Sequence, residues 1–178
     1  MKLAIATLAL ITLVASSLCA PLEVMSVCDA LTRRISLNHK IVAVRGIQLA
    51  TDEGAWLQGV GCGKSITVNG QEWPTFIWLE MSARRRKAAG VEAVELETSV
   101  KRINTAIAKR GFDPKRDRLW LTYVGVFETD DESGQHVDNA GAGAGQIGFG
   151  HLNAARAQLI VKGVRDPFVE HVSKVAAK

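Results

Sequence analysis

The chain has 178 residues, which is a normal size for one domain with a buried core. Its formal net charge of +4 and its isoelectric point near 9.1 are compatible with an anionic partner and equally with none. The apolar run over residues 3–14 is too short to cross a bilayer, and no second such run follows, so we expect no membrane span in the mature protein.

The first twenty residues have the pattern of a secretory signal. Lys2 supplies the positive start, residues 3–14 are apolar, and residues 15–20 are mostly small. We therefore predict a signal peptide over 1–20 and a single domain over 21–178. The mature protein is expected to be exported, to the periplasm or outside the cell.

The cleavage position stays open between two residues. Cleavage after Ser17 fits the small-residue rule better and leaves Cys19 in the mature chain, whereas cleavage after Ala20 removes that cysteine. A lipid on Cys19 is the less favoured alternative, because Ser16-Ser17-Leu18-Cys19 reverses the usual order of leucine and small residue before a modified cysteine.

Cleavage after Ala20 leaves two cysteines, Cys28 and Cys62. An even pair in an exported chain is usually bridged, so we predict a disulfide between them. Two unrelated buried thiols are the alternative. A zinc site is weaker, because no second cysteine pair or histidine pair completes four ligands.

The mature chain begins with a predicted helix and three strands. Ser26 and Asp29 form a helix start, after which Val27, Leu31 and Ile35 share one face. The β-rich segments that follow predict three strands, over residues 40–49, 55–60 and 75–81. Asn69-Gly70 predicts a hairpin turn, and Pro74 is expected to open the third strand.

The second half contains one long predicted helix and two or three strands. The basic segment 83–87 is interpreted as a connector, and an apolar stripe at helical spacing predicts a helix over 91–110. Strands are expected over 119–128 and 155–164, with a polar, glycine-rich loop between them. Asp166-Pro167 is expected to interrupt the last strand, which an edge segment over 168–172 resumes.

This order predicts an α+β, mainly β fold. Three strands, a helix and two strands are the elements of an OB-like five-stranded barrel, with a short N-terminal helix and one long helix between strands 3 and 4. A sheet with helices on one face gives the same string of elements and stays open as the alternative.

Several segments resemble a group of small exported bacterial proteins. They are VCDAL (27–31), VAVRG (42–46), GVGCG (59–63), WPTFIWLE (73–80) and GFGHLNAARAQLIVKGV (148–164). The resemblance lies in core and disulfide positions, so it implies export and an OB-like domain. It implies no active-site residues.

Two glycine-rich segments resemble nucleotide-binding motifs, but neither fits its motif. Residues 61–65, GCGKS, lack the first glycine of a phosphate-binding loop, since position 58 is glutamine. Residues 143–148 spell GxGxxG, but a strand pattern follows them where a dinucleotide site needs a helix. We therefore predict no cofactor.

The loop before the last strand has the residues of a possible metal site. Asp130, Asp131 and Asp138 are hard oxygen ligands, and His151 could complete a metal site or act as a general base. Their spacing matches no EF-hand loop. We therefore favour a solvated acidic loop and a structural, buried role for His151, and we keep the metal site as the alternative.

The basic run Arg84, Arg85, Arg86 and Lys87 could contact anionic lipid or phosphate. The favoured interpretation is a solvated linker. Single-strand binders add exposed aromatic residues to such a run, whereas the four tryptophans lie on predicted strands and are expected to pack in the core.

These observations favour a non-catalytic binding or structural module of the cell envelope. Its partner is expected to be an envelope protein or a glycan, with no nucleic acid. The alternative is a small secreted, metal-assisted hydrolase that uses His151 and the acidic loop.

Overall fold

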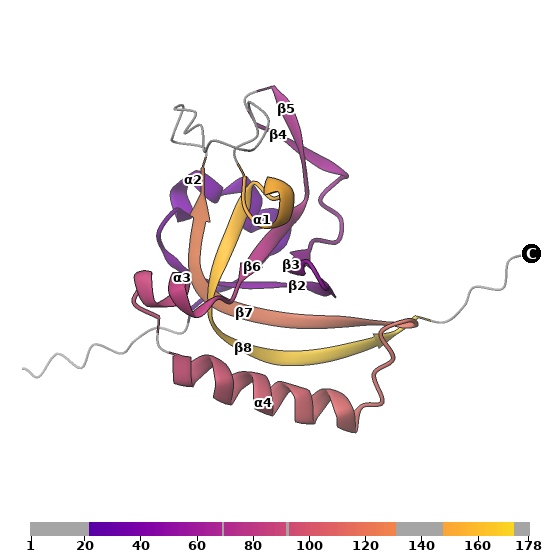
Figure 1. Cartoon of the computed structure of the whole chain (residues 1–178). Coiled ribbons are helices and arrows are strands. Elements are labelled where there is room, and N and C mark those ends of the chain that lie inside the picture. Colours follow the sequence, from indigo (N-terminus) through magenta and orange to yellow (C-terminus); the bar gives the residue numbers. More distant parts are fainter. Residues whose placement is uncertain (1–21, 69, 92, 131–147, 173–178) are drawn as a thin grey trace, which may run out of the picture.

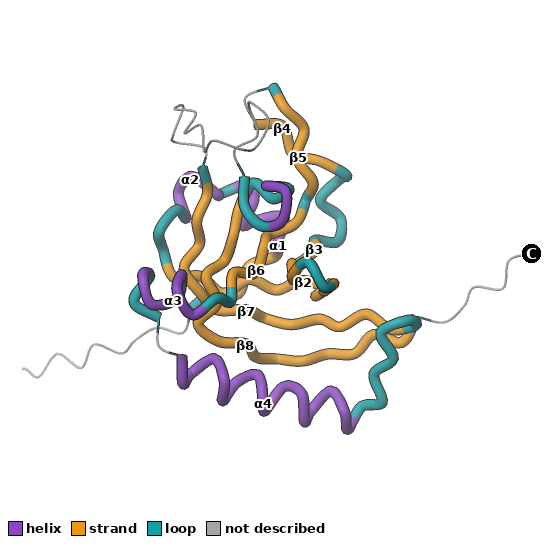
Figure 2. The backbone as a smooth tube through the Cα atoms, in the orientation of Figure 1, coloured by secondary structure: helices purple, strands orange, loops and turns teal. Residues whose placement is uncertain are grey.

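The computed structural model describes residues 22–68, 70–91, 93–130 and 148–172. These residues form a six-stranded mixed sheet, a two-stranded sheet and one longer helix with several short ones (Figures 1 and 2). The mainly β, α+β class predicted from the sequence is confirmed.

The elements are named in chain order. The strands are β1 (Val24–Ser26), β2 (Ile41–Thr51), β3 (Gly54–Gln58), β4 (Ser65–Val68), β5 (Gln71–Pro74), β6 (Phe76–Glu80), β7 (Asp117–Thr129) and β8 (Ala157–His171). The helices are α1 (Val27–Thr32), α2 (Arg34–Leu37), α3 (Ala83–Ala88), α4 (Ala93–Lys109) and the short 3-10 turn η1 (His151–Asn153).

The large sheet closes on itself through β2. Its strand order is β1-β2-β3-β6-β8-β7, and β2 also pairs with β7. Residues 41–47 of β2 pair with β7, and residues 47–51 pair with β3. The hydrogen bonds therefore form a ring through β2, β3, β6, β8 and β7. In this ring β6 and β8 are parallel, and the other neighbours are antiparallel.

Alternating residues of the ring strands point into the core. Leu57, Ile77, Phe127 and Leu159 are fully buried, as the period of two in a strand requires. The predicted stripe of the long helix is confirmed, because Leu96 and Ile103 are buried and Val100 and Ile107 pack against the core. Figure 1 shows α4 lying along β8, where the Ser99 hydroxyl accepts a hydrogen bond from the Val164 N–H at 3.2 Å.

The long strands β7 and β8 bend together (Figure 1). Their register shifts between Trp120 and Thr122 and again between Val124 and Gly125. A Cβ atom at Gly125 would lie 2.2 Å from the carbonyl oxygen of Ile160, so only glycine lets the two backbones approach this closely.

The predicted interruption at Asp166-Pro167 is present as a bulge within β8, where Asp166 has a φ of 54°. The strand β8 continues to His171. Before the dipeptide Arg165 pairs with Thr122 of β7, and after it Phe168 pairs with Trp120 of β7. Neither Asp166 nor Pro167 is paired with a residue of β7, so the missing N–H of proline costs no ladder bond.

The N-terminal helix is partly as expected. Ser26 and Asp29 form the predicted capping box. The helix then ends at Thr32, α2 starts at Arg34, and the side chain of Ile35 is 55% exposed, so its predicted place on the buried face is wrong. The extended residues of β1 before the helix pair with β2 and were not expected.

Two other segments differ from the expectation. The strands β4 and β5 form a separate hairpin in which Val68 pairs with Gln71, and Asn69 lies outside the described residues. Pro74 ends β5, where it was expected to open the next strand. The basic connector is the short helix α3, whose first turn is capped by the Ser82 side chain through the N–H of Arg85.

The predicted disulfide is present. The Sγ atoms of Cys28 and Cys62 are 2.06 Å apart, and the bond joins α1 to the segment after β3. A Cβ atom at Gly59 would lie 2.2 Å from the Cys62 Sγ, so glycine at this position leaves the space that the bridge occupies.

Replacing both cysteines by serine tests the stabilising effect of the bridge. On the chain-entropy model, opening a 34-residue separation lowers the free energy of unfolding by about 3–4 kcal/mol. We expect urea denaturation of the double variant to show this loss, and wild type in reductant to match the variant. A loss below about 1 kcal/mol would mean that the bridge does not constrain the unfolded chain in this way.

Candidate functional site

Three aromatic side chains share the outward face of β3 and β6. The core residues of these strands are Ala55, Leu57, Ile77 and Leu79, so the alternate positions point to the other side. Those positions hold Trp56, Phe76 and Trp78, each of which is half-buried. We call these three residues the aromatic face.

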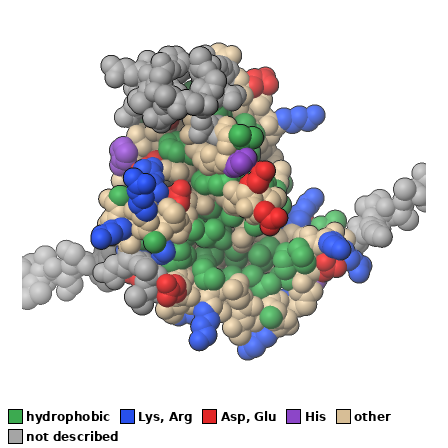
Figure 3. Space-filling model, viewed as in Figure 1, with side chains coloured by type: hydrophobic (Ala, Val, Ile, Leu, Met, Phe, Trp, Pro, Cys, Tyr) green, Lys and Arg blue, Asp and Glu red, His purple; other side chains and the backbone are tan. Residues whose placement is uncertain are grey.

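The rings of the aromatic face are in contact with one another. Trp56 lies between the other two rings, with centroids 6.3 Å from Trp78 and 5.9 Å from Phe76. The planes of Trp56 and Trp78 differ by 16°, so the two indoles are close to parallel. Figure 3 shows hydrophobic side chains gathered in the middle of one side of the molecule, over the region of β6 and β8, and bordered by charged and histidine side chains.

Two glycines pack against the Trp78 ring. A Cβ atom at Gly54 would lie 2.2 Å from Cη2 of this indole, and one at Gly150 would lie 2.3 Å from its Cδ2. Gly54 is the first residue of β3, directly after the turn from β2, and Gly150 belongs to the connection before β8. Trp78 therefore holds two loops that are far apart in sequence against the sheet.

The connection before β8 ends in a closed turn over residues 149–155. The backbones of Phe149 and Ala155 exchange two hydrogen bonds, of 2.7 and 3.1 Å. At the tip, Leu152 has a φ of 55° and its side chain is 79% exposed. A bulky apolar residue in the left-handed region and in solvent is uncommon, and such strain clusters at ligand contacts.

His151 lies in the same turn and is half-exposed. Its Nε2 is 3.7 Å from Oε1 of Glu53, which joins the turn to the β2–β3 loop. The prediction of a buried, structural histidine is therefore wrong with respect to burial. In this turn Gly150 faces Trp78, and the side chain of the next residue, His151, is 47% exposed.

A polar row continues from the aromatic face across the sheet. Trp78 pairs with Gln158 of β8, and Gln158 pairs with Glu128 of β7. The Nε2 of Gln158 donates to Oε2 of Glu128 at 2.5 Å, and Nη2 of Arg85 donates to the same oxygen at 2.8 Å. This row brings helix α3 to the side of the sheet that holds the aromatic face.

The basic run is not a uniformly solvated linker. Arg84, Arg85 and Lys87 are exposed, but Arg86 is only 9% exposed. Its Nε and Nη1 are buried and have no hydrogen-bond partner among the described residues. The sequence pattern missed this difference, because one side of a short helix packs on the sheet and the sequence shows four cations in a row.

The predicted metal site is only partly within the described residues. Asp130 and His151 are described, whereas Asp131 and Asp138 lie outside. In the part of the chain that the structure describes, no three histidine, cysteine, aspartate or glutamate side chains form a group suited to a metal ion. The metal site therefore stays a prediction from the sequence.

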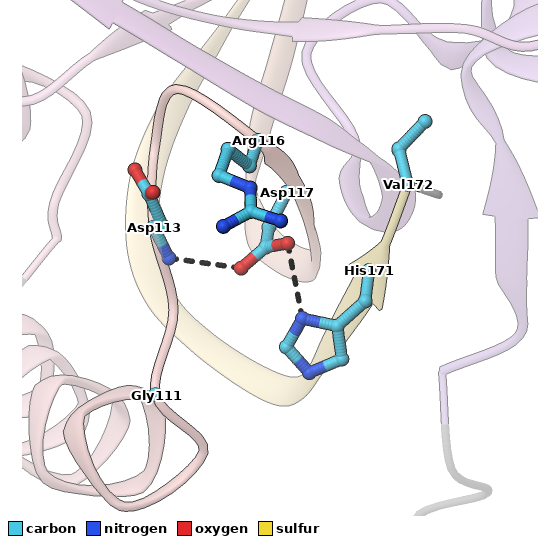
Figure 4. Close-up of a pocket in the computed structure, with 6 residues that line it drawn as sticks. All are labelled: Gly111, Asp113, Arg116, Asp117, His171 and Val172. Carbon is cyan, nitrogen blue, oxygen red and sulfur yellow. Dashed lines mark hydrogen bonds and ion pairs between the residues drawn. The ribbon is translucent and has the colours of Figure 1, made fainter. Parts of the chain in front are cut away.

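A second polar site lies at the far end of β7 and β8 (Figure 4). The Nδ1 of His171 is 3.0 Å from Oδ1 of Asp117, and the N–H of Asp113 donates to Oδ2 of Asp117 at 2.9 Å. These residues line a cavity of about 330 Å³ together with Gly111, Arg116 and Val172. The backbone hydrogen bond from Asp113, and then His171, lower the pKa of Asp117 below its usual value.

Sequence reasoning placed the tryptophans in the core, and this holds for Trp73 but not for the aromatic face. The signal that identifies the face is the alternation itself. If Leu57 and Ile77 point inward, Trp56 and the two neighbours of Ile77 must point outward.

Comparison with known proteins returns no match. No family model fits the chain, and neither the curated proteins nor the solved structures contain a similar one. Among the described residues, no helix has the length and apolar character needed to cross a membrane.

Replacing Gly150 by alanine tests the packing of the turn on Trp78. The new Cβ cannot coexist with the indole in its present position, so we expect a changed tryptophan fluorescence spectrum and faster hydrogen exchange in residues 149–155. Gly70→Ala is the matched control, because its φ of 78° is close to the 77° of Gly150 and its Cβ would meet nothing within 4 Å. Equal effects of both variants would show that the backbone conformation alone matters.

Replacing Asp117 by asparagine tests how far the carboxylate of Asp117 stabilises the fold. A carboxyl with a lowered pKa in the folded state stabilises the fold above its unfolded pKa, and the effect is lost as the pH falls through the folded pKa. We therefore expect D117N to be less stable than wild type at pH 7 and equal to it once the pH is below the folded pKa of Asp117. Denaturation at both pH values measures this, with the exposed Asp52→Asn as the control. A deficit that persists unchanged in acid would contradict the account.

Proposed function

We propose that this chain is a non-catalytic, glycan-binding module of the cell envelope with an OB-like barrel. A signal peptide over 1–20 exports it to the periplasm or the outside. The Cys28–Cys62 disulfide agrees with an oxidising compartment. The resemblance to small exported bacterial proteins points the same way.

The strand order supports the OB-like part of the proposal. Counted along the chain, the ring strands are β2, β3, β6, β7 and β8, and the helix α4 comes between the third and fourth. The ring connects the first strand to the second and fourth, and the fifth to the third and fourth. This connectivity, with a parallel pair between third and fifth strands, suits a Greek-key barrel of the OB type.

The position of the aromatic face is the observation on which the proposed function rests. OB-folds bind oligosaccharides on the face of their second and third strands and on the loops that join strands 1–2 and 4–5. Here β3 and β6 are the second and third strands, and they hold Trp56, Phe76 and Trp78. The two loops are those that pack on Trp78 through Gly54 and Gly150. The inference from the position of the aromatic face to glycan binding is an analogy with other OB-folds.

The chemistry of the face suits a sugar. The C–H groups on one side of a pyranose ring are apolar and gain from burial against a flat aromatic ring, as any apolar surface does. Hydroxyl groups at the ring edge need planar donors and acceptors. Arg85 and Glu128 provide them near Trp78, and the buried Gln158 holds Glu128 in place.

An oligosaccharide array tests the proposal with the purified mature protein. We expect wild type to bind at least one class of oligosaccharide, and Trp56→Ala to weaken that binding about tenfold or more, equivalent to at least ~1.4 kcal/mol. Trp120→Ala is the matched control, since Trp120 is also half-buried on a strand but its Nε1 donates to Glu170, away from the face.

Circular dichroism must show that both variants are folded. Absence of oligosaccharide binding by folded wild type would contradict the proposal. Equal losses in the Trp56 and Trp120 variants would also contradict it, because binding would then not depend on the aromatic face.

A further inference from the structure

Arg86 is the described residue least explained by the fold. Its side chain is 9% exposed, and Nε and Nη1 have no hydrogen-bond partner among the described residues. Buried polar groups are almost always paired, and a buried charge without a partner lowers stability. The buried Nε and Nη1 of Arg86 are therefore hydrogen-bond donors that the described part of the fold does not use.

The backbone around Arg86 is held in place. The Arg86 N–H donates to the Ser82 carbonyl at 3.1 Å, and the Val91 N–H donates to the Arg86 carbonyl at 2.8 Å. On one side, Arg85 forms the ion pair with Glu128. Arg84 and Lys87 are exposed. Among the described residues, only the carboxylate of Glu128 forms an ion pair with the run, so the run keeps an excess of positive charge.

This positive site lies on the polar row of the aromatic face. Two strand spacings of about 4.8 Å separate Trp78 from Glu128 along the row Trp78–Gln158–Glu128. Arg85 contacts Glu128 directly and precedes Arg86 in α3. The Arg85 guanidinium is therefore on the order of 10 Å from Trp78. Trp56 pairs with Trp78 on the next strand, so it is one spacing further away, roughly 15 Å, which is within reach of one short oligosaccharide.

We propose that the aromatic face binds an anionic glycan, with its sugar rings on Trp56 and Phe76 and its acidic group held by Arg86 and Arg85. This proposal rests on the proposed function and adds the chemical class of the ligand. The acidic group is an oxyanion, either a carboxylate or a phosphate on the sugar chain. A guanidinium binds both groups through paired N–H donors, and the positive net charge of the protein favours the approach of such a ligand.

The first test compares oligosaccharides that differ only in charge. Calorimetry is run with tetragalacturonate, a hyaluronan hexasaccharide and a muramic-acid-containing glycan fragment, each as the free acid and as its methyl ester, and with a phosphorylated mannan fragment before and after phosphatase. We expect wild type to bind at least one acid at least tenfold more tightly than its uncharged form.

Binding of both members of every pair with equal affinity would overturn the anionic inference and leave the proposed function standing. Binding of none of the eight would overturn the anionic inference, and the oligosaccharide array would then decide the proposed function. Binding of the acids that is unchanged in Trp56→Ala, together with binding to vesicles of anionic phospholipid, would replace the glycan by a membrane surface.

The second test asks whether Arg86 is a ligand-binding residue or a structural one. If its guanidinium has no partner in the free protein, Arg86→Met removes an unpaired charge, so we expect Tm to rise by about 3 °C while affinity for the acid falls tenfold or more. Arg84→Met is the matched control, as an exposed arginine of the same run, and should leave Tm unchanged.

A fall in Tm for Arg86→Met would overturn the proposal, because it would mean that a carboxylate of the chain already pairs with Arg86. Glu92, six residues further on and outside the described residues, is the candidate, and Glu92→Gln would then lower Tm by a similar amount. If Arg86→Met does not fold, Arg86→Lys keeps the charge without the paired donors and should lose the preference for the acid.

Discussion

The pairing of β2 on both of its edges is the constraint on which the rest of the structure depends. Residues 41–47 pair with β7 and residues 47–51 pair with β3, so one strand closes the ring of hydrogen bonds. A closed ring has one inside, and strand alternation then sends every second side chain outward. The inward positions of β3 and β6 are filled by aliphatic residues, which leaves the aromatic residues on the outer surface.

The sequence predicts the features that local patterns determine. The capping box of Ser26 and Asp29, the apolar stripe of α4 and the Cys28–Cys62 bridge follow from spacing, compartment and composition. The exposed position of Ile35 does not, because it depends on which neighbour packs there. The same is true of Arg86, since its burial comes from the sheet beneath α3 and not from its own helix.

For the candidate site the sequence identified the right segments and assigned them different roles. His151 was considered as a metal ligand or a buried anchor, and it projects from a turn that rests on Trp78. The tryptophans were assigned to the core, where Trp73 does lie. Local patterns do not give the strand register. The register places Trp56 beside Trp78 and Trp78 beside Gln158, and it is set by the pairing of strands that are far apart in sequence.

The most direct measurement is a titration of the four indole N–H signals in ¹H–¹⁵N NMR spectra with the acidic oligosaccharide that binds best. Each tryptophan reports on one part of the fold: Trp56 and Trp78 on the aromatic face, Trp73 on the hairpin and Trp120 on the far end of β7. The account predicts that the Trp56 signal shifts most and that Trp120 stays in place. A shift confined to Trp120, or the same small shift of all four, would place the ligand elsewhere and contradict the central claim.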